Sequence, residues 1–370
     1  MIRKNRLIDE FMELVQVDSE TKNERAISRT LIHKFNELGL QVEEDDAAEK
    51  TGHGSGNLIV TLPATPGKEQ VPPILFTCHM DTVVPGKGIK PRLDDDGYIR
   101  SDGTTILGSD DKAGIAALLE AVRVLRVEGI AHGKIQLVIT VGEEAGLVGA
   151  QALDPKRIDA KFGFALDSNE KVGGIVTAAP YQAKLDVVIT GKKAHAGVNP
   201  EDGISAIQVA AKAISRMPLG RIDHETTANI GSFQGLGPTN IICDRVDIQA
   251  EARSIDKSKL DRQLSLMKEA FESVASEFGA GVEIRTELTP GFYFDEQSEI
   301  VQFAVKAVER IGRKANPFHS GGGSDANIFN QLGIPTVNLA VGYENIHTTR
   351  EQMPVEELIT ARRPLTDLPE

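Results

Sequence analysis

The 370-residue sequence contains only two cysteines, Cys78 and Cys243, and they lie far apart in the chain. So few cysteines argue against a disulfide-stapled scaffold, and we expect a reduced, cytoplasmic protein. No apolar stretch is long enough to span a bilayer, and the N-terminal segment lacks the continuous apolar core of a signal peptide. We therefore expect no association with a membrane.

Basic residues are also in deficit, because 41 Lys and Arg stand against 54 Asp and Glu, for a net charge of −13. A protein that binds nucleic acid needs a basic face, so we expect no nucleic-acid partner. The chain lacks the phosphate-binding pattern GxxxxGK, and no GxGxxG follows a predicted strand. These absences disfavour nucleotide binding. Part of the acidic excess is available to neutralise bound cations.

Length and hydrophobic patterning predict two domains of different construction. A chain of 370 residues is too long for one ordinary core. Apolar, strand-like runs occur at residues 57–62, 74–77, 135–140 and 162–166, with a helix at 112–127 between the second and the third. After Pro290 this pattern returns with a helix at about 299–311 and a strand at 336–340. Such alternation is typical of an α/β domain with a mixed, largely parallel sheet between helices. We predict this catalytic domain from residues 1–177 and 289–370.

The segment between these two pieces has a different pattern. Residues 184–190 and 246–254 alternate apolar and polar side chains, as half-buried antiparallel strands do. Two helices, expected at residues 203–215 and 257–278, are interleaved with them. We therefore predict a smaller α+β domain, residues 178–288, inserted into the first.

Side chains that bind metal or move protons follow several of the apolar segments. They are His79 and Asp81 in HMD, Asp110 and Asp111 in LGSDDKAG, Glu143 and Glu144 in GEEAG, Asp167 in FALDS and His347 in ENIHTTRE. Charged groups just past a buried strand must be paired, solvated in a cleft or bound to metal. Imidazoles and carboxylates without thiolates suit Zn, Mn or Co in a catalytic site.

Each motif alone allows a second interpretation. Asp81 can accept a hydrogen bond from the second ring nitrogen of His79, but HxD also fits a surface turn. The acids of LGSDDKAG also fit a helix start. Of Glu143 and Glu144, one can bind metal while the other faces the substrate, or both can be solvated. All the segments together favour a site for two cations, because chance rarely supplies every ligand.

The motifs HMDTV, LGSDDKAG, GEEAGLVGA, ALDS, AHAG, ARSID, GGGSDAN and NIHTTRE occur in this order. In this the chain resembles, over nearly its whole length, the M20 family of co-catalytic zinc peptidases, and most closely its tripeptidase-like (peptidase T) branch. The resemblance implies that Asp110 bridges two metals. His79 and Asp167 would complete one metal site, and Glu144 and His347 the other.

The resemblance also implies roles for the neighbouring groups. Glu143 would be the general base toward a water held by the metals, and Asp81 would be the partner of His79. The peptide between Asp110 and Asp111 would be cis. The cofactors would be two divalent ions per chain, Zn²⁺ by expectation, with Co²⁺ or Mn²⁺ as alternatives.

The inserted domain would be a lid, through which a homodimer could form. His195 would donate a hydrogen bond to an oxyanion, Asn240 would hold the substrate backbone, and the planar fork of Arg253 would bind a peptide carboxylate. The alternative leaves all three on the lid surface, with Arg253 paired to an acid.

The glycine run that ends at Ser324 also has two interpretations. The family likeness favours a contact of Gly322, Gly323 and Ser324 with the substrate backbone. The alternative is a flexible loop with Ser324 as the N-cap of the next helix.

We therefore expect a dinuclear metal-dependent aminopeptidase that acts on short peptides, in particular tripeptides. Related amidohydrolases with the same metals stay open: a carboxypeptidase, a dipeptidase or an N-acyl-amino-acid deacylase. A non-catalytic metal-binding or peptide-binding protein is disfavoured by Glu143, because a binding protein needs no base beside a full set of ligands.

Overall fold

The computed structural model describes residues 2–366 and divides into two compact units. The second unit consists of Ala179–Tyr293 together with Gly321–Gly323, and the first unit holds the rest of the chain. The first unit is therefore built from separate pieces of sequence. The roles of lid and dimerisation surface, assigned from the sequence to residues 178–288, stay predictions.

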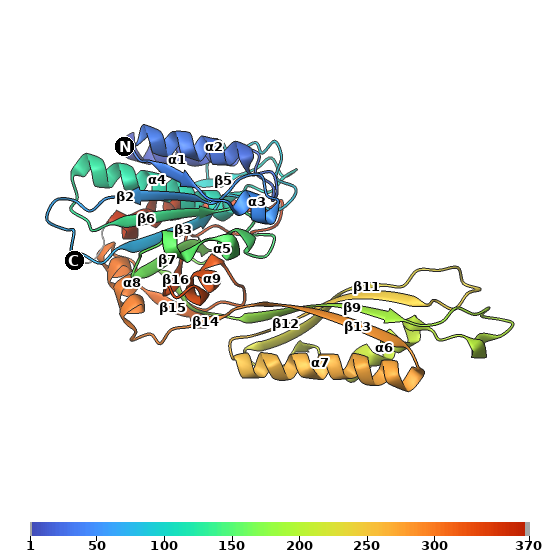
Figure 1. Ribbon diagram of the computed structural model, residues 1–370. Coiled ribbons are helices and arrows are strands. Elements are labelled where there is room, and N and C mark those ends of the chain that lie inside the picture. Colours follow the sequence, from blue (N-terminus) through green and yellow to red (C-terminus); the bar gives the residue numbers. More distant parts are fainter. Residues whose placement is uncertain (1, 367–370) are drawn as a thin grey trace. The chain divides into compact units, whose positions relative to one another are not determined.

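The first unit contains a large mixed sheet with the strand order β1-β2-β6-β3-β7-β16-β8 (Figure 1). The strands are β1 (Val42–Glu44), β2 (Leu58–Leu62), β3 (Ile74–His79), β6 (Ile135–Thr140), β7 (Phe162–Ser168), β8 (Gly174–Ala179), β15 (Asn316–His319) and β16 (Thr336–Ala340). Neighbours are parallel from β6 through β3 and β7 to β16, and β15 pairs in parallel with β8. The predicted α/β class is confirmed.

Helices cover both faces of this sheet (Figure 1). They are α1 (Ile2–Val15), α2 (Arg25–Glu37), α3 (Ala47–Thr51), α4 (Ser109–Glu128), α5 (Val148–Ala152), α8 (Glu299–Arg310), α9 (Asp325–Gln331), α10 (Val355–Ala361) and α11 (Arg363–Thr366), with a 3₁₀ turn at Pro155–Arg157. Alternate strand residues enter opposite cores. Phe76 packs into the core that includes α1, α4 and α8, whereas Leu75 packs into the core that includes α9.

A second, three-stranded sheet of the first unit joins distant parts of the chain. Its order is β17-β5-β4, with β4 (Arg92–Leu93), β5 (Tyr98–Arg100) and β17 (Gln352–Pro354). β17 pairs antiparallel with β5, and the Arg100 Nε donates a hydrogen bond to the Gln352 side-chain oxygen at 2.7 Å. The segment after His347 is therefore held against residues of the first third of the chain.

The second unit is a five-stranded antiparallel sheet with the order β10-β11-β12-β9-β13 and two helices packed against it. The elements are β9 (Tyr181–Thr190), α6 (Ala206–Arg216), β10 (Gly220–Arg221), β11 (Thr226–Gln234), β12 (Arg245–Ser254), α7 (Lys257–Phe278) and β13 (Gly281–Thr289), with a 3₁₀ turn at Pro200–Asp202. The short strand β14 (Phe292–Tyr293) is not part of this sheet. Along β9, alternate residues such as Leu185 and Val187 are buried while Lys184 and Asp186 are exposed. One face of the sheet therefore carries the core.

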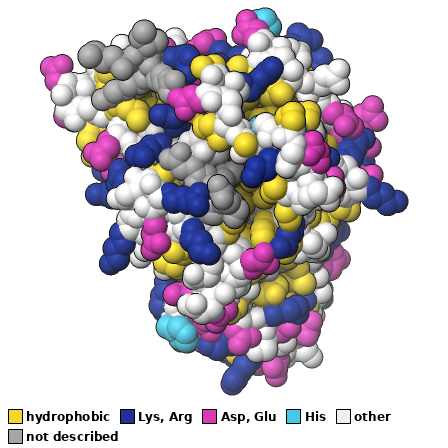
Figure 2. Space-filling view, turned by 90° about the vertical axis from the view of Figure 1, so that its left-hand side faces the viewer, with side chains coloured by type: hydrophobic (Ala, Val, Ile, Leu, Met, Phe, Trp, Pro, Cys, Tyr) yellow, Lys and Arg dark blue, Asp and Glu magenta, His cyan; other side chains and the backbone are white. Residues whose placement is uncertain are grey.

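Among residues 2–366, no helix has the length and apolar character needed to cross a membrane. On the face shown in Figure 2, Lys and Arg side chains are interspersed with Asp and Glu and with hydrophobic side chains. Charges of the two signs are thus mixed on that face.

Candidate metal centre

Three neighbouring strands of the first unit bring polar side chains to one edge of its sheet. β3 ends at His79, Glu143 and Glu144 follow the end of β6, and Asp167 lies near the end of β7. Because β6, β3 and β7 are parallel neighbours, their carboxyl ends meet at the same edge. That edge is where open α/β sheets bind their ligands.

The carboxylate of Asp110 lies between two histidines at this edge. Its Oδ1 is 3.0 Å from His79 Nε2, and its Oδ2 is 3.3 Å from His347 Nε2. Asp110 stands at the start of α4, where its backbone angles are not helical. The peptide between Asp110 and Asp111 is cis, as the family resemblance predicted. The two oxygens of one carboxylate thus face two separate imidazoles.

Each of these histidines has a further carboxylate beside it. Asp167 Oδ1 is 3.8 Å from His79 Nε2, and Glu144 Oε1 is 2.9 Å from His347 Nε2. The structure therefore brings together all five residues that the resemblance assigned as metal ligands. They form two groups, each with one imidazole and one carboxylate, and Asp110 lies between the groups.

Asp111 also lies within reach of this cluster. His79, Asp111 and Asp167 each offer a ligand atom within 4.8 Å of the others, as do His79, Asp110 and Glu144. However, the Asp111 carboxylate accepts hydrogen bonds from the backbone N–H groups of His79, at 3.2 Å, and Gly114, also at 3.2 Å. These bonds give Asp111 a structural function at the end of β3.

Burial and crowding shift the pKa values of these groups. Burial, together with neighbouring carboxylates, raises the pKa of Asp167 and of Glu143 well above the usual range. Burial acts in the same direction on Asp110, but hydrogen bonds from His347 and His79 hold the pKa of Asp110 well below its usual value. Hydrogen bonds to Asp110 and Glu144 raise the pKa of His347 to about 10. So many buried carboxylates require positive charge among them.

The donor atoms of the cluster fit two divalent cations. Two imidazoles and three carboxylates, with no sulfur ligand, match the ligands of zinc, cobalt or manganese in catalytic sites. Asp110, His79 and Asp167 would hold one ion, and Asp110, Glu144 and His347 would hold the other. Cations there would also supply the positive charge that the buried carboxylates need.

Glu143 and Asp81 lie beside the ligand cluster. Within residues 2–366, no group donates a hydrogen bond to the Glu143 carboxylate, so that carboxylate keeps its capacity to accept a proton. The Asp81 carboxylate accepts hydrogen bonds from the backbone N–H of Glu143 at 3.0 Å, the backbone N–H of Glu144 at 3.3 Å and the Thr21 hydroxyl at 2.8 Å. Asp81 therefore fixes the loop that carries both glutamates.

Asp81 is the neighbour of His79, as the resemblance implied, and its backbone oxygen makes the closer contact. The Nδ1 of His79 lies 3.0 Å from the backbone oxygen of Asp81 and 3.6 Å from its Oδ1. The backbone carbonyl can orient the ring as a carboxylate would. The carboxylate is instead engaged by the loop after β6.

Three residues that position the ligands were not identified from the sequence. The Tyr343 hydroxyl donates to Asp167 Oδ1 at 2.9 Å, and the Asn338 side chain bonds to both the backbone N–H and the carbonyl of Asp167. The Glu351 carboxylate accepts hydrogen bonds from the backbone N–H groups of Leu107, Gly108 and Asp110. Their position near His347 or on β16 was the available hint, but their partners are far away in sequence.

In the second unit, His195 and Asn240 lie on adjoining loops. The backbone N–H of Ala196 donates to the Asn240 carbonyl at 2.9 Å, and both His195 and Asn240 are exposed. The backbone N–H of Gly197 donates to His195 Nδ1 at 3.1 Å. With Nδ1 as the acceptor, a neutral ring carries its proton on Nε2, for which the part of the chain that the structure describes gives no partner.

Arg253 is paired with an acid, which is the alternative left open by its sequence. Its Nε and Nη2 lie 3.0 and 3.1 Å from the two carboxylate oxygens of Glu251, and its Nη1 is 3.3 Å from the Gly321 carbonyl. Ser324 occupies the N-cap of α9, and its backbone N–H donates to the Asn327 side chain at 3.0 Å. Substrate contacts of Arg253, Gly322, Gly323 and Ser324 stay predictions.

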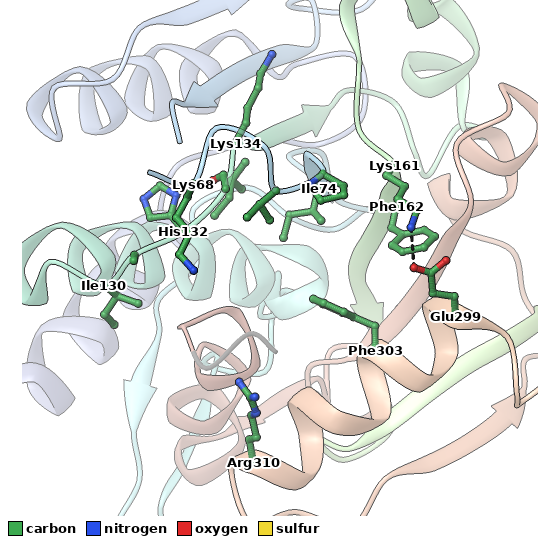
Figure 3. Close-up of a pocket in the computed structure, with 15 residues that line it drawn as sticks. Lys68, Ile74, Ile130, His132, Lys134, Lys161, Phe162, Glu299, Phe303 and Arg310 are labelled. Carbon is green, nitrogen blue, oxygen red and sulfur yellow. Dashed lines mark hydrogen bonds and ion pairs between the residues drawn. The ribbon is translucent and has the colours of Figure 1, made fainter. Parts of the chain in front are cut away.

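A separate cavity of about 530 Å³ opens at the opposite edge of the large sheet, where β3, β6 and β7 begin (Figure 3). Its wall is apolar at Phe162 and Phe303 and basic at Lys68 and Lys134. Its acid, Glu299, pairs with Lys161 at 2.6 Å. The lining holds one acid, Glu299, and one histidine, His132, whereas the cluster of carboxylates and imidazoles lies at the other edge.

Comparisons with known proteins identify the family of this chain. The family description "Peptidase family M20/M25/M40" matches residues 75–369. The crystal structure of the aminopeptidase PepT from Bacillus cereus is 59% identical, with a TM-score of 0.91 over 98% of this chain and 97% of that one. A tripeptidase from Staphylococcus aureus is 49% identical, with a TM-score of 0.94 over 99% and 97%.

A curated relative, the Bacillus subtilis protein YqjE, is 57% identical over 97% of this chain and 96% of its own. The matched family segment includes all five candidate ligands and Glu143. The chain therefore belongs to peptidase family M20/M25/M40, and it is a metal-dependent peptidase.

Proposed function

We propose that this protein is a dinuclear aminopeptidase that releases the N-terminal residue of short peptides, with tripeptides as its preferred substrates. The observation that carries the two-metal proposal is the carboxylate of Asp110, whose two oxygens face His79 and His347. The substrate class is supported by the names of the two similar crystal structures, an aminopeptidase and a tripeptidase.

The proposed cofactors are two zinc ions, with cobalt or manganese as substitutes that the same donors accept. His79 and Asp167 would hold one ion, Glu144 and His347 the other, and Asp110 both. When bound, the ions would polarise the scissile carbonyl and lower the pKa of the attacking water.

The protein's own groups would move the proton and hold the substrate. Glu143 would take the proton of the attacking water and return it to the leaving amine. Asp81 supports this role because it fastens the Glu143 backbone. His195 would donate from Nε2 to the developing oxyanion, and Asn240, Gly322, Gly323 and Ser324 would contact the peptide backbone.

We further propose that the protein works in the cytoplasm and that it forms a homodimer through the second unit. The low cysteine content supports the first proposal. His195 would then act either within its own chain or across the dimer. Mixing the two inactive variants His195→Ala and Glu143→Gln separates these cases, because only action across a dimer restores activity.

The proposed function is tested with a small peptide panel on metal-free protein reconstituted with zinc, cobalt or manganese. The panel contains trialanine, dialanine, N-acetyl-trialanine and trialanine amide. We expect uptake of two ions per chain and the fastest turnover for trialanine, with free alanine and dialanine as products. The N-acetylated peptide should be cleaved far more slowly, because an aminopeptidase needs the free ammonium group.

The same panel distinguishes the related activities. Preference for the N-acetylated peptide would replace our proposal with a deacylase, and exclusive cleavage of dialanine would replace it with a dipeptidase. Cleavage of N-acetyl-trialanine to alanine and N-acetyl-dialanine, with no cleavage of trialanine amide, would indicate a carboxypeptidase. Glu143→Gln protein, loaded with the same metal, is the control for contaminating peptidases.

Arg253 gives a prediction on substrate recognition. Replacing a guanidinium that binds the substrate carboxylate removes roughly 1.5–3 kcal/mol, so Arg253→Ala should raise KM for trialanine by about 10–100-fold. KM for trialanine amide should change little. Steady-state kinetics on the two peptides measures the difference.

Glu251→Gln is the matched control, because it weakens the ion pair of Arg253 but keeps the guanidinium. It should not raise KM for trialanine. If Arg253→Ala affects the free and the amidated peptide equally, Arg253 serves only the structure of β12.

A further inference from the structure

Glu351 is a buried carboxylate that no cation neutralises directly within the described residues. Glu351 is buried, with a relative exposure of 2%. Oε2 accepts hydrogen bonds from the backbone N–H groups of Leu107 and Gly108, both at 2.8 Å, and Oε1 accepts from the Ser109 hydroxyl at 2.6 Å and the Asp110 backbone N–H at 3.0 Å. Four donors on one carboxylate compensate for its burial.

These donors belong to the segment that delivers Asp110 to the centre. Gly108 is the N-cap residue of α4, so the N-cap provides no side-chain hydrogen bond to the start of that helix. Two of the donors, Leu107 and Gly108, precede the helix. Glu351 therefore fixes the loop that leads into Asp110 rather than only the first helical turn.

Glu351 itself lies next to the other half of the centre. It follows His347 by one short turn, in which its own N–H donates to the Thr348 carbonyl at 3.1 Å. Directly after it, β17 pairs with β5, and Gln352 also exchanges backbone hydrogen bonds with Glu344. The position of Glu351 is thus set by the same segment that carries His347.

We propose that Glu351 is a positioning residue that sets the distance between Asp110 and His347, and with it the geometry of the dinuclear centre. This inference rests on the proposed metal centre. Asp110 and His347 come from distant parts of the chain, and their side chains lie 3.3 Å apart. Glu351 links them, because it accepts a hydrogen bond from the Asp110 backbone N–H and lies in the segment that carries His347. Without that link, the two ligands of the second ion would no longer be fixed relative to each other.

Glu351→Gln tests the proposal with little change in shape. The amide keeps one acceptor oxygen, but its NH₂ group faces two of the four donors. We expect the affinity for at least one metal ion to fall by about 10–100-fold, as for other groups that orient ligands. The affinity is measured on metal-free protein by competition with a chromophoric chelator. The absorption spectrum of the Co²⁺ form should change, and kcat should fall with KM nearly unchanged.

Two further variants exclude simpler explanations. Ser109→Ala removes one of the four hydrogen bonds without changing the charge. It should lower the metal affinity by a smaller factor than Glu351→Gln does. Glu120→Gln is the matched control, since Glu120 is a fully buried carboxylate further along α4 that is held by Arg6 from α1. It should lower the melting temperature but leave both metal affinities and the Co²⁺ spectrum unchanged.

Wild-type affinities and an unchanged spectrum in Glu351→Gln, with only a lower melting temperature, would overturn the proposal. An effect of Glu351→Gln with none of Ser109→Ala would also overturn it, because charge alone would then explain the result. If Glu351→Gln does not fold, Ser109→Ala decides. Failure of the wild-type protein to bind two ions would instead contradict the proposed function.

Discussion

Replacement of Glu143 with glutamine is expected to lower kcat by about 10²–10⁴-fold, the usual contribution of a general base. The amide keeps the shape of the side chain but cannot accept a proton at neutral pH. Its backbone N–H still bonds to Asp81, so the loop should keep its place. The metal content, measured by elemental analysis, should stay at two ions per chain.

The neighbouring glutamate provides the matched control. Glu144→Gln should lose activity together with the ion held by Glu144 and His347, whose side chains lie 2.9 Å apart. If Glu143→Gln loses metal and Glu144→Gln keeps it, the two residues have exchanged roles. Full activity of Glu143→Gln would remove Glu143 from the mechanism.

Asp110→Asn is expected to weaken both metal sites at once. Asparagine has one oxygen and a neutral amide, so it cannot give a charged oxygen to each ion. We expect a loss of affinity larger than the roughly 10–100-fold caused by changes outside the ligand set. Turnover should fall with the occupancy of both ions. Titration of metal-free protein with Zn²⁺ or Co²⁺ measures the two affinities separately.

The histidines on either side of Asp110 are the controls for this variant. His79→Ala and His347→Ala should each lower the affinity for mainly one ion, because each imidazole faces a different oxygen of Asp110. The bridging role is contradicted if Asp110→Asn loses one ion while the second binds with wild-type affinity.

Local signals in the sequence predicted many of the elements. The helix expected at 257–278 begins and ends as observed, since Asp256 caps its first turn and Gly279 adopts a left-handed conformation, φ 68°, at its end. The strands at 135–140 and 336–340 also match, because their apolar runs are fully buried. By contrast, we did not predict β13. It lies at the sheet edge, and alternate residues such as Glu283 and Arg285 are exposed.

The candidate site shows the same division between local and long-range information. The order of strands and acids along the chain was sufficient to expect His79, Glu143 and Asp167 at one sheet edge. Partners were harder to predict. The bonds of the Asp81 carboxylate to the loop after β6, and the four bonds of Glu351, join segments that only the folded chain brings together.

The position of β16 has a consequence for synthesis of the chain on the ribosome. β16 lies between β7 and β8 in the large sheet, yet it follows the whole second unit in sequence. A nascent chain that has completed the second unit still has a gap between those strands, and His347 and Glu351 have not been made. The sheet and the proposed metal centre are therefore completed only after translation of nearly the whole chain, and we expect an interrupted product to lack peptidase activity.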